Sequence, residues 1–332
     1  MTQSRCSQIS LQDTCYYHLI SRCVRRAFLC GVDKQTKQSF EHRRQWMVDR
    51  IRFLSTVFSI DVAAYAVMSN HYHLVVHVNQ AQAKEWTIEE VCQRWGQLYQ
   101  CHPLVKRLLM NTSSCQAEVD CALVIIEKWR LQLTDISWLM RNLNEYIARK
   151  ANKEDVCKGR FWEGRFKSQA LLDEKAVLAC MAYVDLNPIR AKIAYTPETS
   201  EFTSIFERIH GKASNKDSIN EMSSTTKPLL GFIGNSHQDS PCGIAFSLLD
   251  YLTLIEATGK IIREDKKGYI AENTQPLLQQ LGINSEDWLA LAQHFGKTYH
   301  QAVGSLDKLA QFACHTNKKW ISGHRQQLSI FH

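Results

Sequence analysis

The stretch Met68-Ser69-Asn70-His71-Tyr72-His73-Leu74-Val75-Val76 carries two histidines into an apolar run. Residues two apart on an extended strand point to the same side, so His71 and His73 share one face and Tyr72 lies on the other. We expect the Tyr72 face to be the core face. The two imidazoles, with Cα atoms roughly 7 Å apart, can converge on one metal ion, whereas His77 lies about 13 Å beyond His73 and is too far away.

The alternative explanation of this pair is chance. The chain has 13 histidines in 332 residues, and a His-x-His pair arises in roughly half of such sequences. The pair therefore needs support from the segments around it.

Those segments predict the order strand, helix, strand, strand. Residues 15–23 are rich in aromatic and branched side chains and predict a first strand. Apolar residues recur at helical spacing over 37–58, and residues 60–67 predict the second strand, which turns at 68–70 into the histidine strand. The outer side of the helix is expected to hold Arg43, Arg44 and Arg50.

The next part of the chain is mostly helical. A capping box begins at Thr87, and helical spacing recurs over 117–133 and 136–147. Residues 160–167 then alternate aromatic with charged side chains, which predicts a fourth strand with one wet face. If the helices over 81–133 are an insertion, the remainder is an α+β fold of order βαββαβ, with an antiparallel sheet and helices on one side.

A helix beginning after Asp173 brings two polar side chains together. It is expected to run to about Leu186, because Pro188 pushes the preceding residue out of helical conformation. Tyr183 and Asn187 are four apart and share a face beside small residues, which leaves room for a ligand. The alternative is a tyrosine that packs at a helix end and an asparagine that caps it.

The chain divides into three parts by composition. Residues 1–205 hold the predicted α+β domain, and 206–235 form a linker because 211–228 are polar and aperiodic. Residues 236–332 predict a C-terminal α-helical module, with helices over 244–258, 285–295 and 303–314.

Charge favours a polyanionic partner. The net charge is +7, and residues 1–52 hold ten Lys or Arg against four acids. A concentrated basic surface attracts nucleic acid, although a solvated, charged helix face is the alternative.

The remaining composition predicts a cytoplasmic protein. We see neither a signal peptide nor a membrane span. The 12 cysteines are scattered with no C-x-x-C pair, so we expect buried apolar residues and neither disulfides nor a zinc cage.

Three segments together carry a family resemblance: M-S-N-H-Y-H-L-V-V at 68–76, G-R-F-W-E-G-R-F-K-S at 159–168, and A-Y-V-D-L-N-P-I-R-A at 182–191. In this order they resemble the REP-associated tyrosine transposases, which belong to the HUH single-tyrosine transposases of insertion sequences. The likeness covers roughly residues 10–200, interrupted at 81–133. It implies a ferredoxin-like βαββαβ nuclease fold over 1–205, and DNA transposition by cleavage and rejoining of single-stranded or hairpin DNA through a covalent 5'-phosphotyrosine.

The resemblance also implies the roles of individual residues. His71 and His73 match the metal-binding pair, Tyr183 matches the nucleophile, and Asn187 matches the third protein ligand. Two imidazoles and an amide oxygen leave about three places of an octahedral ion open, which suits Mg²⁺ or Mn²⁺. The basic residues expected to contact DNA are Arg22, Arg25, Arg26, Arg165, Lys167 and Arg190.

Two other functions remain open from the sequence. A domesticated DNA-binding protein would keep the fold but mobilise nothing. A zinc-stabilised structural or RNA-binding protein would hold Zn²⁺ tightly and form no covalent adduct. The oligomeric state is open between a monomer and a homodimer.

Overall fold

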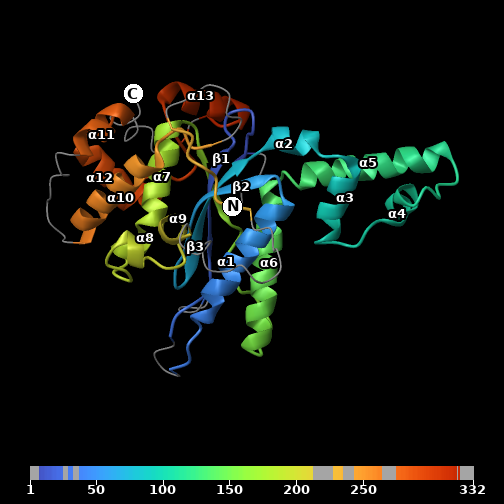
Figure 1. Cartoon of the computed structure of the whole chain (residues 1–332), viewed down its shortest axis with the longest axis horizontal. Helices are drawn as coiled ribbons and strands as arrows, with labels where there is room; N and C mark the ends of the chain where they lie inside the picture. Colours follow the sequence, from blue (N-terminus) through green and yellow to red (C-terminus); the bar gives the residue numbers. More distant parts are fainter. Residues whose placement is uncertain are drawn as a thin grey trace.

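The computed structural model describes residues 7–24, 29–32, 37–211, 227–234, 243–263, 274–319 and 321. It is an α+β structure around a five-stranded sheet of order β2-β3-β1-β4-β5 (Figure 1). The strands are β1 (Tyr16–Arg22), β2 (Ile60–Val67), β3 (His71–Val78), β4 (Lys167–Leu171) and β5 (Ala302–Val303). The first four pair antiparallel, but β5 pairs parallel with β4, so the sheet is mixed and the expectation of a purely antiparallel sheet is wrong.

The helices follow the strands in two groups. Between β1 and β4 lie α1 (His42–Val57), α2 (Gln80–Glu85), α3 (Ile88–Gly96), α4 (Pro103–Leu109), α5 (Gln116–Gln132) and α6 (Ile136–Glu154). After β4 come α7 (Glu174–Asp185), α8 (Asn187–Arg190), the 3₁₀ turn η1 (Pro197–Thr199), α9 (Ser204–His210), α10 (Leu248–Arg263), α11 (Gln275–Leu281), α12 (Ser285–Thr298) and α13 (Leu306–His315).

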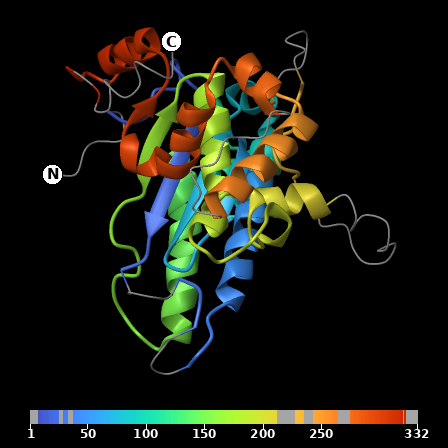
Figure 2. The same ribbon diagram turned by 90° about the vertical axis from the view of Figure 1, so that its left-hand side faces the viewer.

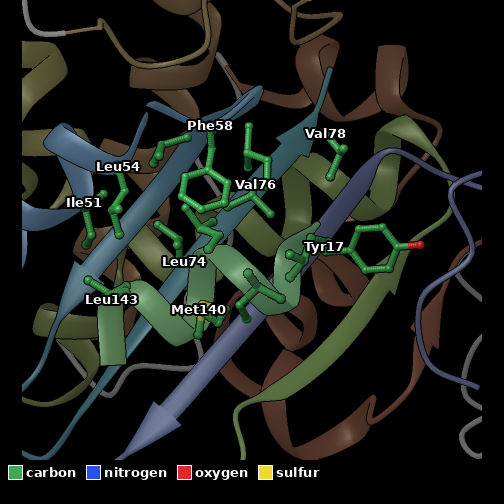
Figure 3. Close-up of a cluster of buried hydrophobic side chains, with 14 of the residues drawn as sticks. Tyr17, Ile51, Leu54, Phe58, Leu74, Val76, Val78, Met140 and Leu143 are labelled. Atoms are coloured by element: carbon green, nitrogen blue, oxygen red, sulfur yellow. The ribbon is translucent and has the colours of Figure 1, made fainter. Parts of the chain in front are cut away.

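One face of the sheet is covered by α1 and α6, as predicted. Leu74 and Val76 of β3 pack there with Phe58, which follows α1, and with Met140 of α6 (Figure 3). All four side chains are buried. This is the face that the alternation of β3 assigned to the core.

The opposite face is also covered, so the expectation of helices on one side is wrong. Helix α7 lies against β2 and β3 there, and α10 and α12 pack beyond it (Figure 2). The facing residues are small: Ala66 of β2 meets a helix that carries Ala176, Ala179 and Ala182. Because these side chains are small, the helix approaches the sheet closely and buries the polar residues that lie between helix and sheet. His73 is therefore buried and not exposed to solvent.

The fourth strand lies a little further along the chain than predicted. Trp162 makes only an isolated bridge with Cys23, and β4 begins at Lys167. Trp162 instead packs into the core and donates its indole N–H to the carbonyl of Asn144 at 2.8 Å. Alternating aromatic and charged residues can thus mark an anchored loop as well as a strand.

Part of the N-terminal basic charge is internal. Arg43 is fully buried and pairs with Glu154 and Asp155 at the end of α6. Arg44 is also buried; it pairs with Glu41 and donates to the backbone carbonyl of Val67 on β2. These arginines therefore join α1 to its neighbours and are not on the outer face where the sequence placed them.

The segment over 81–133 projects away from the sheet (Figure 1). Helices α3 and α5 pack around stacked Trp95 and Trp129, whose ring centroids are 5.1 Å apart. The predicted capping box at Thr87 is present at the start of α3. The apolar packing of the insertion is continuous with the core on the α1 and α6 side of the sheet.

The C-terminal segments pack onto the same sheet as the N-terminal ones. β5 extends the sheet beside β4, and α12 packs against α7. Most of the predicted linker lies outside the described residues. No helix among the described residues is both long and apolar enough to cross a membrane.

Asp185 connects α7 to the helices that follow it. Its carboxylate is fully buried and accepts hydrogen bonds from the Ser204 hydroxyl, from the backbone N–H of Ile205 at 3.0 Å and from the Tyr251 hydroxyl at 2.6 Å. Asp185→Ala leaves these buried donors unpaired, so we expect a loss of roughly 3 kcal/mol in the free energy of unfolding. Denaturant titration measures it. Tyr251→Phe removes a single donor and should cost less than Asp185→Ala; equal costs would contradict this assignment.

Candidate active site

The histidine strand and α7 bring the predicted residues together on the α7 side of the sheet. His71 begins β3 and pairs with Arg22 of β1, while His73 pairs with Ile20. His71 is half-buried, whereas His73 is only 3% exposed. The ring centroids of the two histidines are 4.9 Å apart.

A third histidine, His18, joins this pair. Its Nε2 lies 2.9 Å from Nδ1 of His73, and its Nδ1 lies 2.9 Å from Oε1 of Gln169 on β4. The sequence analysis missed both residues. Alternation along residues 15–23 could place His18 on a face, but only the strand order β3-β1-β4 puts it between His73 and Gln169.

Tyr183 lies against the histidines. Its ring centroid is 5.6 Å from that of His73 and 6.2 Å from that of His18. Burial raises the pKa of the Tyr183 phenol, and the charge of Arg190 opposes that rise. The guanidinium of Arg190 stacks on the Tyr183 ring, 3.8 Å from its centroid. The structure thus places a cation beside the candidate nucleophile.

Asn187 follows one turn later, at the start of α8. It is buried, and its Nδ2 has no hydrogen-bond partner among the described residues. Asn187, Tyr183 and His71 line one hollow of about 630 Å³. The amide nitrogen is a hydrogen-bond donor and suits an anionic oxygen, whereas the amide oxygen of Asn187 is the atom that can bind a cation.

A second hollow, of about 450 Å³, opens on the other side of His71. Arg22, Arg165 and Lys167 line it, so three of the predicted DNA contacts meet there. Arg190 instead lines the first hollow, and its Nη1 donates to the backbone carbonyls of Tyr183 and Ala292, both at 2.7 Å. The predicted contacts Arg25 and Arg26 lie outside the described residues.

The C-terminal module packs against Tyr183 and forms one side of the site, which the sequence did not predict. Phe295 of α12 packs on Tyr183 with ring centroids 5.9 Å apart. Gly296 lies so close that a Cβ there would come within 2.6 Å of the Tyr183 hydroxyl. Only glycine therefore fits without moving the tyrosine, and α12 encloses the site.

The donor atoms present fit a divalent cation. Burial lowers the pKa of His71 to about 4 and that of His73 well below its usual value, so both imidazoles are neutral and can offer a lone pair at neutral pH. Nδ1 of His71 contacts Oδ1 of Asn70 at 2.7 Å, and Nε2 of His73 is buried with no hydrogen-bond partner in the described part of the chain. Among the described residues, no three His, Cys, Asp or Glu side chains form a metal-binding group. The candidate set is therefore two imidazoles and the Asn187 amide.

The chain is similar in fold to a solved structure. No family model and no curated protein matches the chain. The structure matched is that of a REP-associated tyrosine transposase bound to a REP hairpin, at 12% identity and a TM-score of 0.38, over 68% of this chain and 94% of that one.

Proposed function

We propose that the chain is a transposase of the HUH single-tyrosine type, which cleaves and rejoins single-stranded or hairpin DNA with the help of Mg²⁺ or Mn²⁺. One observation carries the proposal. His71, Tyr183 and Asn187 come from separate elements and line one hollow, while His73 holds an unpaired nitrogen beside the Tyr183 ring. Packing alone gives no reason for this set of side chains to meet.

Tyr183 is the nucleophile in this proposal. Its phenolic oxygen attacks the phosphorus of a phosphodiester, a tyrosine–phosphate bond forms, and the bond to the 3' oxygen breaks. The phenol loses its proton to solvent, and the departing 3' oxygen takes one up. A phosphotyrosine keeps the energy of the broken ester, so the reverse attack by a 3' hydroxyl rejoins the strand without ATP.

His71, His73 and Asn187 hold the cation. When bound, Mg²⁺ or Mn²⁺ supplies charge screening and polarisation of the phosphoryl group. Arg190 assists the deprotonation of Tyr183, because a cation 3.8 Å from the ring centroid favours the phenolate over the phenol.

The strand order supports the finer fold assignment. Without β5, the sheet runs β2-β3-β1-β4 with every neighbouring pair antiparallel. This is the arrangement expected of a ferredoxin-like βαββαβ fold, with α2–α5 as the insertion and the C-terminal strand β5 as an addition.

Arg22, Arg165 and Lys167 form the proposed phosphate-binding surface beside the site. Replacing all three with alanine should weaken binding to every DNA sequence alike, because phosphate contacts carry no sequence information. The slope of log K against log salt should flatten by up to about three units. Binding titrations at several salt concentrations measure it.

A matched control variant loses three positive charges on another part of the protein. Arg107, Arg141 and Arg149 lie on α4 and α6 and pair with Glu118 or Glu145. Replacing these three with alanine should leave the salt slope within about one unit. A loss confined to one DNA sequence in the first variant would instead mean that its residues contact bases.

The proposed function is tested by trapping the covalent intermediate. The protein is incubated with labelled single-stranded or hairpin DNA and Mg²⁺, then denatured and digested, and the DNA-linked peptide is identified by mass spectrometry. We expect the label on Tyr183. A protein that binds DNA but forms no adduct with any divalent cation would fit the domesticated DNA-binding protein instead.

A further inference from the structure

A chain of hydrogen bonds runs from the C-terminal module to His73, one of the proposed metal ligands. It crosses three adjacent strands: Gln169 on β4, His18 on β1 and His73 on β3. Gln169 and His18 are direct partners in the β1–β4 register. The Gln169 side chain in turn reaches the backbone of Tyr299, just beyond α12.

The backbone carbonyl of Tyr299 determines how the side-chain amide of Gln169 is oriented. It lies 2.6 Å from Nε2 of Gln169, and a carbonyl oxygen can only accept, so this end of the amide must be the NH₂ group. The other end is then the amide oxygen Oε1, which faces Nδ1 of His18 at 2.9 Å. An amide oxygen also only accepts, so Nδ1 of His18 must carry the hydrogen.

The same argument from donors and acceptors determines which ring nitrogens of His18 and His73 carry a hydrogen. His18 is fully buried, and its hydrogen-bond partners among the described residues are an amide and a second imidazole, so no carboxylate there compensates a charge and the ring is neutral. With its hydrogen on Nδ1, its Nε2 is a bare acceptor, and Nδ1 of His73, 2.9 Å away, must donate to it. Nε2 of His73 therefore has no hydrogen, and this nitrogen is one of the buried atoms that have no hydrogen-bond partner among the residues described.

We propose that Tyr299, Gln169 and His18 fix the tautomer of His73, so that its Nε2 lone pair is held free for the cation. His18 and Gln169 are thus positioning residues, and this role rests on the proposed metal site. Histidine ligands of metals commonly donate their second ring N–H to an acceptor, which holds the ring and its tautomer. Here the acceptor is the imidazole of His18. The Tyr299 carbonyl of the C-terminal module determines, through Gln169, which nitrogen of His18 accepts.

The tautomer can be measured without metal, DNA or activity. Nitrogen-15 NMR of the metal-free protein distinguishes the two ring nitrogens, and comparison with His73→Gln assigns the His73 signals. We expect His73 to be a single Nδ1–H tautomer in the wild type. In His18→Phe, which keeps a ring but removes the acceptor, this tautomer should no longer dominate.

Metal affinity gives the second readout. Loss of a hydrogen-bonding partner of a ligand weakens metal binding by about 10- to 100-fold, so His18→Phe should weaken Mn²⁺ binding by that factor. Gln169→Leu removes the acceptor for His18 and should shift both readouts in the same direction while leaving all imidazoles in place. His77→Phe is the control, because His77 lies on the same strand but contacts Asp61 instead; it should change neither readout.

The outcomes separate the two proposals. If His73 remains an Nδ1–H tautomer in both His18→Phe and Gln169→Leu, or if His77→Phe weakens Mn²⁺ binding equally, the hydrogen-bond chain has no such role. If the wild type shows the expected tautomer but binds no Mn²⁺, the metal site is overturned while the tautomer assignment stands.

Discussion

Tyr183→Phe should abolish the covalent adduct and lower strand cleavage by more than about 10⁴-fold, as loss of a nucleophile does in other covalent enzymes. The change deletes the one atom that can bond to phosphorus. The ring that packs on His73, Phe295 and Arg190 remains. Metal and DNA binding should therefore persist, and gel analysis of cleavage beside a binding titration tests both.

Tyr195 offers the matched control. It lines the same hollow as Tyr183 but is 75% exposed and is followed by no amide on a shared helix. Tyr195→Phe should cleave at the wild-type rate within a few-fold. Cleavage by Tyr183→Phe, or a DNA-linked peptide that contains Tyr195, would overturn the assignment of the nucleophile.

Local patterns predicted most of the elements around the site. β2 has the bounds expected, and Asp173 caps α7 by accepting from the N–H of Ala176. Such signals are carried by neighbouring residues, so the sequence displays them directly. The pair of Tyr183 and Asn187 was found in this way, through helical spacing, and both line the hollow with His71.

What the sequence could not predict depends on contacts between distant segments. His18 is 55 positions from His73 and 151 positions from Gln169. No spacing rule connects them, because their meeting depends on the order of strands in the sheet. The same holds for Gly296, whose contact with Tyr183 needs the packing of α12 on α7.

The expectation that helices cover only one face of the sheet is wrong for the same reason. Polar residues at alternate positions of β3 predict a wet face, and His71 is indeed half-exposed. His73 is buried because helices from later in the chain cover that face. Alternation reports the polarity of a face but not whether another element packs on it.

His73→Ala should reduce cleavage to background while DNA affinity falls by no more than about threefold, because affinity comes mainly from Lys and Arg contacts with phosphates. In the proposed mechanism His73 would offer its Nε2 to the cation, and it forms the end of the hydrogen-bond chain through His18. Its removal takes away a proposed metal ligand and leaves the Arg22, Arg165 and Lys167 surface intact. Cleavage and DNA binding are measured on the same preparations.

Controls must separate loss of the ligand from loss of folding, since His73 is buried. His71→Ala removes the other imidazole from a half-exposed position, where a cavity costs less, and should lose cleavage equally. His77→Ala removes an imidazole from the same face of β3, outside both hollows, and should keep cleavage. Equal loss of DNA binding and cleavage in His71→Ala would contradict a metal role, because a cation ligand is needed for the chemical step and phosphate contacts are needed for affinity.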